Sequence, residues 1–480
     1  MTKIPIRIGL EIHAQLKTRT KLFCSCRAQT FGMAPNHYIC PTCSGQPGSL
    51  PVLNQQAVEL SIKAALAIGS KVQLESYFDR KTYQYADLPK GYQITQHRHP
   101  IARGGGLFIR SDGRKARVGI QRIHLEEDTG KLVYISTQKK TEALLDLNRS
   151  GVPLIEIVTY PELTTPEDTA QFLDRLRTLL TLFDICSGAM EQGAFRCDAN
   201  ISLMDQKGER STTPVEIKNL NSFHHIRSAL SYEANRLVAD RNHTKNTLVE
   251  TRGWDETHKK TYYLRTKPRG GYRYIPDPDL PPIRLSLGLV QQIKEGMPEL
   301  PFNRADRIAK TYGLSIAQSE VFAFRPTLSD FFEECVRSFR HVSQVSHWVL
   351  HSIHPILNRQ NREIHQTCLN PHHLIDLLKR VNDGRITDHL ARNVLPELME
   401  HGGSVQELLT AKGVEPITSQ KQVEDLVRKI ISSHPRERAE YNQGRTNVLH
   451  FFIGQVMKAT RGQAEPIEVR KAVEKRLKEV

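Results

Sequence analysis

The sequence predicts an α+β protein: a mixed, largely antiparallel β-sheet domain, then an all-α helical domain and a small helical tail domain. Short apolar runs rich in β-branched residues, such as Val152–Val158, predict buried strands in the first part of the chain. From Leu300 onward apolar residues recur at helical spacing. A chain of 480 residues is also too long for one hydrophobic core. The predicted domains span 1–291, 292–405 and 406–480.

Composition and charge narrow the class of protein. Hydrophobic residues make up 39% of the chain and charged residues 25%, as in soluble globular proteins. The formal net charge of +15 favours polyanionic partners, nucleic acid first, although a generally basic proteome would give the same excess. No apolar run reaches the roughly 20 residues that span a bilayer, and no signal or transit peptide is visible. We expect a soluble cytoplasmic protein with no membrane partner; the alternative is a matrix protein of an organelle that has lost its leader.

The first strand is predicted at Ile8–Leu16, where apolar and polar residues alternate. Glu11 and His13 lie two positions apart and therefore face the same side of this strand. A carboxylate and an imidazole on one face are candidate metal ligands, or an ordinary polar face of a sheet.

Four of the eight cysteines form a C-x-C pair followed by a C-x-x-C pair. In a reducing compartment this spacing suits a tetrahedral zinc knuckle, here at 24–43, while four reduced structural thiols are the alternative. Because four thiolates leave no open coordination position, the predicted site is structural rather than catalytic. The four residues are Cys24, Cys26, Cys40 and Cys43.

A predicted helix at Gln55–Ile68 precedes a polar-aromatic stretch, Phe78–Gln96, which we expect to be a long loop. Basic residues among aromatic ones suit contacts with phosphates and bases, whereas a solvated loop with surface tyrosines is the alternative. Long loops in compact domains are more often functional than idle. The residues concerned are Arg80, Lys81 and Lys90, with Tyr83, Tyr85 and Tyr92.

Acidic residues gather at two places. Gly119–Gly130 is predicted to be a strand that runs into an acidic turn, Glu126-Glu127-Asp128, which fits either a surface turn or a site for a hard cation. Glu156 lies inside a predicted buried strand, where a lone carboxylate needs an ion-pair partner or a metal. Since Arg149 lies just upstream, several carboxylates and one Arg together suit a magnesium–phosphate site.

The remaining elements of the first domain are two helices and two strands. Thr164–Phe183 and His225–Asp240 are predicted helices, and Met190–Ser202 and Val215–Phe223 are predicted antiparallel strands with polar tips. The proline-rich segment Arg273–Pro282 is predicted to lead out of this domain.

The tail is predicted to consist of two or three small helical hairpins from Leu408 to Val480. Its basic residues suit salt-sensitive phosphate contacts, although interspersed glutamates also fit a solvated helix face. These basic residues are Lys458, Arg461, Arg470, Lys471 and Arg476.

Taken together, the chain resembles the GatB family, the B subunits of aspartyl/glutamyl-tRNA amidotransferases. The resemblance covers nearly the whole chain in the family's order and rests on long motifs. These are IGLEIHAQL, FCSC…CPTCSGQPGSLPVLN, FDRKTYQYADLPKGYQITQ, RIHLEEDTGKL, DLNRSGVPLIEIV, RCDANIS, EIKNLNSF, YRYIPDPDLPP and FFIGQVMKATRGQAEP.

The resemblance implies a tRNA-dependent amidotransferase. Such proteins work with an A subunit that releases ammonia from glutamine and with a small C subunit. A tRNA mischarged with Glu or Asp is held by the B subunit, which phosphorylates the side-chain carboxylate with ATP and Mg²⁺. Ammonia then displaces phosphate to give Gln-tRNA, Asn-tRNA or both, according to the accompanying mischarging synthetase, itself a candidate partner. A non-catalytic, zinc-containing tRNA-binding scaffold of the same complex is the alternative.

The resemblance also implies roles for single residues, which place the catalytic site in the first, cradle-like domain. Ligands of magnesium would be Glu11, His13, Glu127 and Glu156. Lys90 and Arg149 would neutralise phosphate, and further cofactor contacts would come from Arg80, Lys81, Glu126 and Asp198. The clustered cysteines match the zinc-bearing members of the family. Two departures are Gly271, where an Asp is usual, and Ala86, where a Pro is usual.

Overall fold

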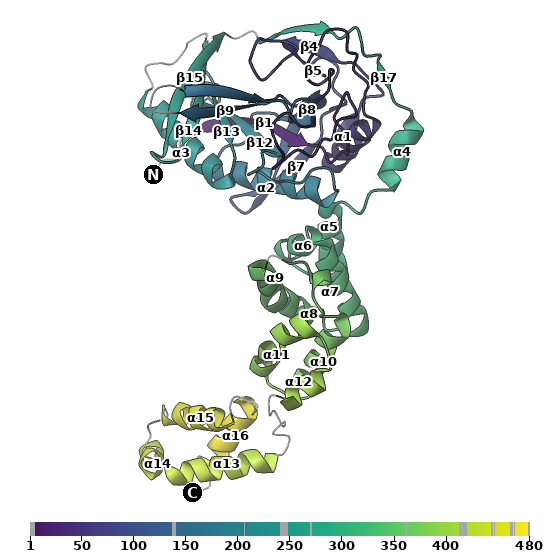
Figure 1. The fold of residues 1–480 in the computed structure, drawn as a ribbon. Coiled ribbons are helices and arrows are strands. Elements are labelled where there is room, and N and C mark those ends of the chain that lie inside the picture. The colour runs from purple at the N-terminus through teal and green to yellow at the C-terminus, as the bar shows by residue number, and fades with distance from the viewer. Residues whose placement is uncertain are drawn as a thin grey trace. The chain divides into compact units, whose positions relative to one another are not determined.

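A computed structural model of the chain shows two compact units, Met1–Leu300 and Pro301–Val480 (Figure 1). The structure describes residues 5–136, 141–205, 207–240, 248–268, 271–360, 362–411, 420–442, 445, 447–460, 464 and 466–478.

Ten strands of the described residues in the first unit form one sheet. They are β1 (Ile6–Gln15), β2 (Lys71–Val72), β6 (Ala102–Arg103), β7 (Gly106–Ser111), β8 (Arg114–Glu127), β11 (Pro153–Thr159), β12 (Phe195–Leu203), β13 (Val215–Leu220), β14 (Leu248–Asp255) and β15 (Lys260–Pro268). Their order is β15-β14-β13-β12-β1-β11-β8-β6-β2, with β7 paired to β8. All these pairs are antiparallel except β13 and β14, which run parallel. The predicted antiparallel sheet is therefore confirmed.

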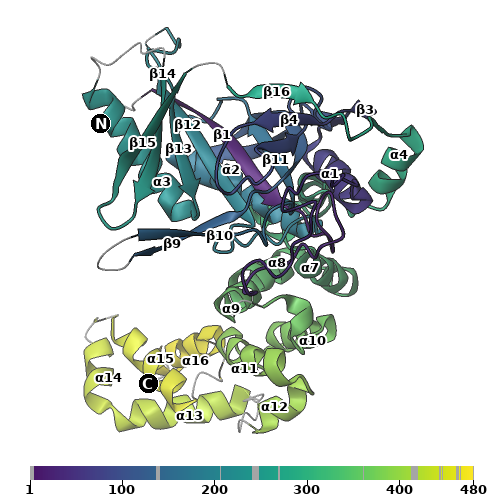
Figure 2. The ribbon, with the colours of Figure 1, turned by 45° about the horizontal axis from the view of Figure 1, so that its top comes forward.

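Three helices cover one face of this sheet (Figures 1 and 2). They are α1 (Gln55–Ile68), α2 (Pro166–Leu182) and α3 (Phe223–Ala239). Each begins at a side-chain cap: Asn54, Thr165 and Ser222 accept hydrogen bonds from backbone N–H groups of the first turn. On the central strand β1, Ile8, Leu10 and Ile12 are buried, so the residues between them face away from the core.

The polar-aromatic stretch Phe78–Gln96 is not the long loop that we expected. It contains β4 (Asp79–Thr82) and β5 (Tyr92–Thr95), which form a second sheet with β16 (Arg273–Pro276) in the order β16-β4-β5. The strands are only four residues long, too short for an alternating pattern to stand out. The segment Arg273–Pro282 therefore does more than lead out of the domain, because its first residues pair with β4.

One predicted strand is shorter than expected. The predicted strand at Met190–Ser202 begins only at Phe195, because residues before it form a turn.

The connection after β8 forms a hairpin of β9 (Lys131–Ser136) and β10 (Thr141–Asp146). A short pair, β3 (Glu75–Ser76) and β17 (Ile283–Arg284), precedes α4 (Leu287–Glu295), which contacts α1. The predicted boundary at residue 291 falls inside α4.

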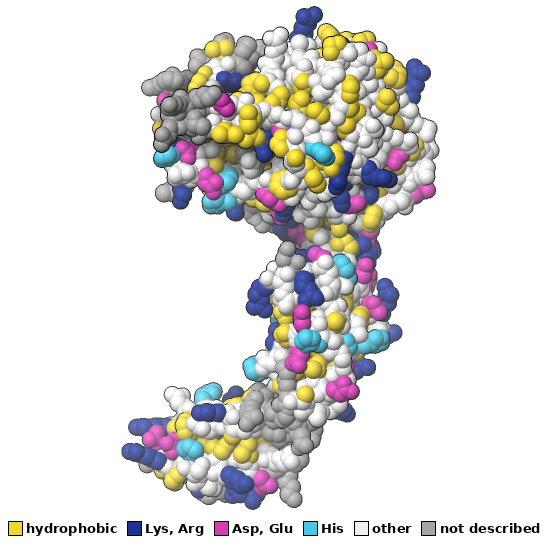
Figure 3. Space-filling model, viewed as in Figure 1, with side chains coloured by type: hydrophobic (Ala, Val, Ile, Leu, Met, Phe, Trp, Pro, Cys, Tyr) yellow, Lys and Arg dark blue, Asp and Glu magenta, His cyan; other side chains and the backbone are white. Residues whose placement is uncertain are grey.

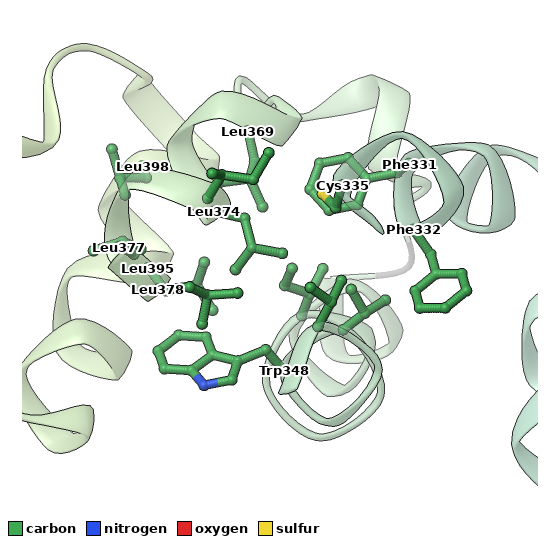
Figure 4. Packing of buried hydrophobic residues seen from close by; sticks show 14 of the residues in the cluster. Phe331, Phe332, Cys335, Trp348, Leu369, Leu374, Leu377, Leu378, Leu395 and Leu398 are labelled. Carbon is green, nitrogen blue, oxygen red and sulfur yellow. The ribbon is translucent and has the colours of Figure 1, made fainter. Parts of the chain in front are cut away.

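The second unit is helical throughout its described part and contains two separate cores. The first core is formed by α5 (Pro301–Tyr312), α6 (Ile316–Ala323), α7 (Pro326–Ser338), α8 (Val342–Trp348), a π-helix (Val349–Ile353), α9 (His354–Gln360), α10 (Pro371–Asn382), α11 (Asp388–His401) and α12 (Val405–Ala411). Figure 4 shows Trp348 packed against Leu378 in this core, with Phe331 and Phe332 on the preceding helix α7. Leu409 of α12 belongs to this core, beyond the predicted boundary at 405.

The second core belongs to the tail. It is formed by α13 (Gln420–Ser433), α14 (Pro435–Asn442), α15 (Val448–Ala459) and α16 (Pro466–Lys478). Arg470 and Lys471 of α16 pair with Glu474 and Glu468 on the same helix, while Arg461 lies outside the described residues. In the view of Figure 3, Lys and Arg side chains are scattered over both units rather than gathered in one patch. None of the described helices combines the length and apolarity that crossing a bilayer requires.

Candidate active site

A row of charged side chains crosses the centre of the main sheet, on the face opposite the helices. In the register of the sheet, His13 of β1 lies opposite Arg196 of β12 and Glu156 of β11. Glu156 in turn lies opposite His124 of β8. Because directly paired residues point to the same face, the sheet brings together groups that are more than a hundred residues apart in the sequence.

Four members of this region form a histidine–carboxylate cluster, defined here as His13, His124, Glu126 and Glu156. His13 Nε2 lies 3.3 Å from Glu156 Oε2 and 3.7 Å from Glu126 Oε1. His124 Nε2 lies 3.4 Å from an oxygen of each of the two carboxylates. The ligand atoms of His13, Glu126 and Glu156 all lie within 4.8 Å of one another, which is close enough to hold one metal ion.

Burial and the neighbouring charges shift the pKa values of this cluster in opposite directions. Burial alone would raise the pKa of Glu156, but His124 and His13 outweigh burial and hold this pKa well below its usual range. Burial alone would lower the pKa of His124, yet Glu156 and Glu126 raise it to about 9. The two histidines therefore hold the Glu156 carboxylate in its ionised form. Glu126 is buried, so the alternative of an acidic surface turn is wrong.

Next to this cluster lies a second group of acids around Lys218. Lys218 Nζ lies 2.5 Å from Asp198 and 3.4 Å from Glu216, and Asn200 donates a 3.3 Å hydrogen bond to Glu11. Burial, followed by the charges of Glu156 and Glu216, raises the pKa of Glu11. Glu11 is therefore crowded by other carboxylates, an arrangement that a bound cation would relieve.

The small sheet β16-β4-β5 brings Lys81 toward the histidine–carboxylate cluster. The ammonium group of Lys81 lies 4.7 Å from the centre of the Tyr272 ring. Burial alone would lower the pKa of Lys81, but Glu126 and Glu156 raise it, so the side chain stays charged beside the cluster. Arg80, its neighbour on β4, pairs instead with Asp277 and Asp279 at 2.9 and 2.6 Å. The two predicted cofactor residues thus have different surroundings, as alternation along a strand requires.

Glu127 is not brought into the histidine–carboxylate cluster. Its carboxylate forms an ion pair with Lys90 and accepts a hydrogen bond from the backbone of Ile94. Arg149, the other predicted phosphate ligand, donates hydrogen bonds to the carbonyl oxygens of Thr129 and Gly130 at 2.9 and 2.7 Å. Of the predicted magnesium ligands, the structure groups His13 and Glu156 most closely, with Glu126 in the place predicted for Glu127.

His124 and the partner of Asp128 were not predicted from the sequence. His124 was not a candidate, although it shares strand parity with Glu126 and could have been found from that spacing. Asp128 is buried and accepts hydrogen bonds from Arg196 at 2.9 and 3.0 Å. The Asp128–Arg196 pair joins different strands of the sheet, and no local sequence pattern predicts it.

The four clustered cysteines also come together. Their sulfur atoms all lie within 4.8 Å of one another, which suits one metal ion. Hydrogen bonding with Cys24 lowers the pKa of Cys43 to about 4, and this thiol is thereby prepared to act as a thiolate ligand.

The two departures from the family pattern lie near the small sheet. Ala86 lines an open pocket of about 380 Å³ together with Gln84, Leu88 and Gly91. Gly271 has a φ of 70°, in the left-handed region that favours glycine, while Arg269 and Gly270 before it lie outside the described residues. A larger hollow of about 570 Å³ lies in the second unit and is lined by none of the predicted site residues.

Two protein families and several known proteins match this chain over nearly its whole length. Residues 6–291 match the family described as GatB/GatE catalytic domain, and residues 330–477 match the family described as GatB domain. Two similar curated proteins are both named as the B subunit of aspartyl/glutamyl-tRNA(Asn/Gln) amidotransferase. The protein from Thermotoga maritima is 42% identical over 473 residues, and that from Carboxydothermus hydrogenoformans is 39% identical over 472 residues. Each alignment covers 98% of this chain and 98% of the relative.

Proposed function

Because the chain belongs to the family of aspartyl/glutamyl-tRNA(Asn/Gln) amidotransferase B subunits, we propose that it activates the side-chain carboxylate of a mischarged tRNA with ATP. It serves a tRNA-dependent amidotransferase complex, in which it would act with a glutaminase A subunit and a small C subunit. The tRNA carries Glu or Asp in place of Gln or Asn. The synthetase that supplies the mischarged tRNA is a further candidate partner.

The chemistry requires activation because a carboxylate is a poor electrophile. One oxygen of the side-chain carboxylate attacks the γ-phosphorus of ATP, ADP leaves, and an acyl phosphate forms. Ammonia then attacks the acyl carbon, and inorganic phosphate leaves with the former carboxylate oxygen. Phosphoryl transfer depends mainly on positioning and on neutralisation of charge.

The observation that carries this proposal is the histidine–carboxylate cluster on the face of the sheet opposite the helices. His13, Glu126 and Glu156 would hold Mg²⁺, with Glu11 beside them, and their oxygen-rich donor set suits a divalent cation. When bound there, Mg²⁺ supplies positive charge to the phosphate oxygens. Lys81 adds a second positive charge beside the cluster. A protein that only bound RNA would gain nothing from carboxylates facing a polyanion.

Zinc is the metal that we propose for the four cysteines. Cys40 and Cys43 place their sulfur atoms 3.8 Å apart. A tetrahedral zinc ion with Zn–S bonds of about 2.3 Å has S–S edges of roughly 3.8 Å, so the residues present fit this ion. The site would be structural, because four thiolates fill the coordination sphere.

The tail would contact the tRNA through its basic residues. The net charge of +15 supports a polyanionic partner, and Lys471 is exposed on α16. Such contacts release counterions, so tRNA binding should weaken steeply as salt is added. Cytoplasmic location remains a prediction from the sequence.

The test compares Glu156→Gln with the wild-type protein in a complex reconstituted with A and C subunits, Glu-tRNA, ATP and Mg²⁺. We expect tRNA-dependent ATP hydrolysis to be lost while tRNA binding and glutaminase activity remain. Glu191→Gln, at an exposed turn, is the matched control and should behave as wild type. Unchanged turnover in Glu156→Gln would overturn the proposal and leave the chain as a tRNA-binding scaffold.

A further inference from the structure

Lys21 is a buried cation beside the cysteine knuckle, and neither motif nor spacing assigned it a role. Its side chain is 0% exposed. Nζ lies 3.4 Å from Cys43 Sγ, 2.9 Å from the carbonyl oxygen of Tyr38 and 3.4 Å from that of Leu147. The three N–H groups of the ammonium therefore have three acceptors.

The charge of Lys21 needs compensation, because an uncompensated ammonium is costly in the interior. Within the described residues, no carboxylate forms an ion pair with Lys21, and the contacting group that can carry negative charge is the Cys43 sulfur. Four thiolates around Zn²⁺ carry a net charge of −2, and the ammonium offsets half of it. Lys21 and the metal knuckle therefore stabilise each other.

Lys21 also reaches the turn Asp146–Gly151, which lies between β10 and β11. Besides the contact with Leu147, the backbone N–H of Leu22 donates a 2.8 Å hydrogen bond to the carbonyl of Gly151. Gly151 has a φ of 84°, and a Cβ there would lie 3.3 Å from the Cβ of Cys43. The turn is therefore fitted tightly against the knuckle.

Further hydrogen bonds join the knuckle to the same turn. Ser150 Oγ donates to the carbonyl of Cys43 at 2.8 Å. Asn148 accepts from the backbone N–H of Tyr38 at 2.8 Å and donates to the carbonyl of Ala34 at 2.6 Å. The knuckle thus supplies hydrogen-bond partners to Asn148 and Ser150, two buried polar side chains that would otherwise be left unpaired.

This turn carries Arg149 and leads directly into β11, the strand of Glu156. Arg149 donates to the carbonyls of Thr129 and Gly130, which follow Glu126 and Glu127 at the end of β8. A chain of contacts therefore runs from the cysteines through Lys21 and the turn to both acidic strands of the candidate active site.

We propose that Lys21 is a positioning residue that links the metal knuckle to the Asp146–Gly151 turn by donating hydrogen bonds to the Cys43 thiolate and the Leu147 carbonyl. The metal then does more than stabilise its own loop: it fixes the place of Arg149 and the start of β11. This inference rests on the zinc binding included in the proposed function and deepens it.

The test uses the full chain with Lys21→Met, which keeps the length and apolar contacts of the side chain. The control is Lys17→Met, because Lys17 lies in the same segment but pairs with Asp184 at the surface. Zinc affinity is measured by competition with a chromogenic chelator. We expect Lys21→Met to bind zinc at least tenfold more weakly, as for other groups that hydrogen-bond a metal ligand, and Lys17→Met to match the wild type.

Two more measurements separate positioning from packing. In the cobalt(II)-substituted protein, loss of the N–H···S hydrogen bond raises the energy of the sulfur donor orbital, so the sulfur-to-cobalt band should move to longer wavelength only in Lys21→Met. Hydrogen exchange should show faster exchange at Leu22 and Tyr38, whose N–H groups bond to the turn, in zinc-free wild type and in Lys21→Met.

Each outcome decides the question. A wild-type chain that binds no zinc would overturn both the metal assignment and this inference. Zinc binding by wild type with an unchanged affinity and cobalt band in Lys21→Met would overturn the inference alone. If Lys21→Met does not fold, the wild-type exchange experiment decides: equal exchange at Leu22 and Tyr38 with and without zinc would refute the link.

Discussion

Replacing Asp128 by asparagine should lower the stability of the first unit by about 3 kcal/mol. Asp128 is 2% exposed and accepts hydrogen bonds from both terminal nitrogens of Arg196 and, at 2.8 Å, from Gln15. Removing one partner of a buried ion pair typically costs about 3–5 kcal/mol, because the other charge is left buried. Since the Arg196 side chain is 20% exposed, water can hydrate it in part, and the lower end applies.

The assay is urea unfolding of the full chain, with a probe that reports on the first unit alone. The chain has two tryptophans, Trp254 in the first unit and Trp348 in the second. In a Trp348→Phe background, Trp254 fluorescence follows the first unit, which avoids treating a chain of several units as two-state. Asp174→Asn removes an exposed partner of Arg177 and serves as control.

The pH dependence supplies an independent check. Burial alone would raise the pKa of Asp128, but Arg196 and Arg149 outweigh it and hold the pKa well below its usual range. A carboxyl group with a depressed pKa stabilises the fold above its unfolded pKa of about 3.9, and this contribution is lost as the pH falls further. The difference between wild type and Asp128→Asn should therefore shrink below about pH 4. A loss under about 1 kcal/mol, or a loss equal to that of Asp174→Asn, would refute the buried-pair argument.

Three further predictions concern the knuckle, the helical core and the phosphate charge. Gly151→Ala should cost about 1–3 kcal/mol and more than Gly32→Ala, because both have positive φ but only Gly151 approaches other atoms; equal losses in urea unfolding would contradict the contact. Leu374→Ala should cost about 2–5 kcal/mol, because Leu374 is fully buried in the first helical core; Trp348 fluorescence in a Trp254→Phe background measures it, and a loss below about 1 kcal/mol would show that this core is loosely packed. Lys81→Met should lower kcat/KM for ATP by about tenfold or more at unchanged unfolding midpoint; an unchanged value would remove Lys81 from the site.

How far the sequence predicts the structure depends on how local each signal is. The helices at Gln55–Ile68 and Thr164–Phe183 carry caps and apolar spacing within a few residues, and the structure places them with the same bounds or within two residues. The buried strand around Glu156 was likewise visible from its β-branched run. The strands β4 and β5 were not, because their four-residue lengths and mixed polar character leave no periodicity to detect.

The candidate site shows the same distinction. His13 and Glu156 could be predicted because each stands out against an apolar strand. Whether Glu126 or Glu127 faces His13 depends on the register and ending of β8, which local sequence does not encode. Lys21 could not be found at all, because a lysine near cysteines is unremarkable until its burial is known.

The position of β1 has a consequence for the synthesis of the protein. The central strand β1 precedes both of its sheet neighbours in the chain, since β11 and β12 end only at Thr159 and Leu203. At a synthesis rate of about 5–20 residues per second, β1 waits roughly ten to forty seconds for both partners. Both edges of β1 stay unpaired until β11 is made, and one edge stays unpaired until β12 is made. The nascent chain should therefore depend on chaperones that hold extended segments until β12 has emerged from the ribosome.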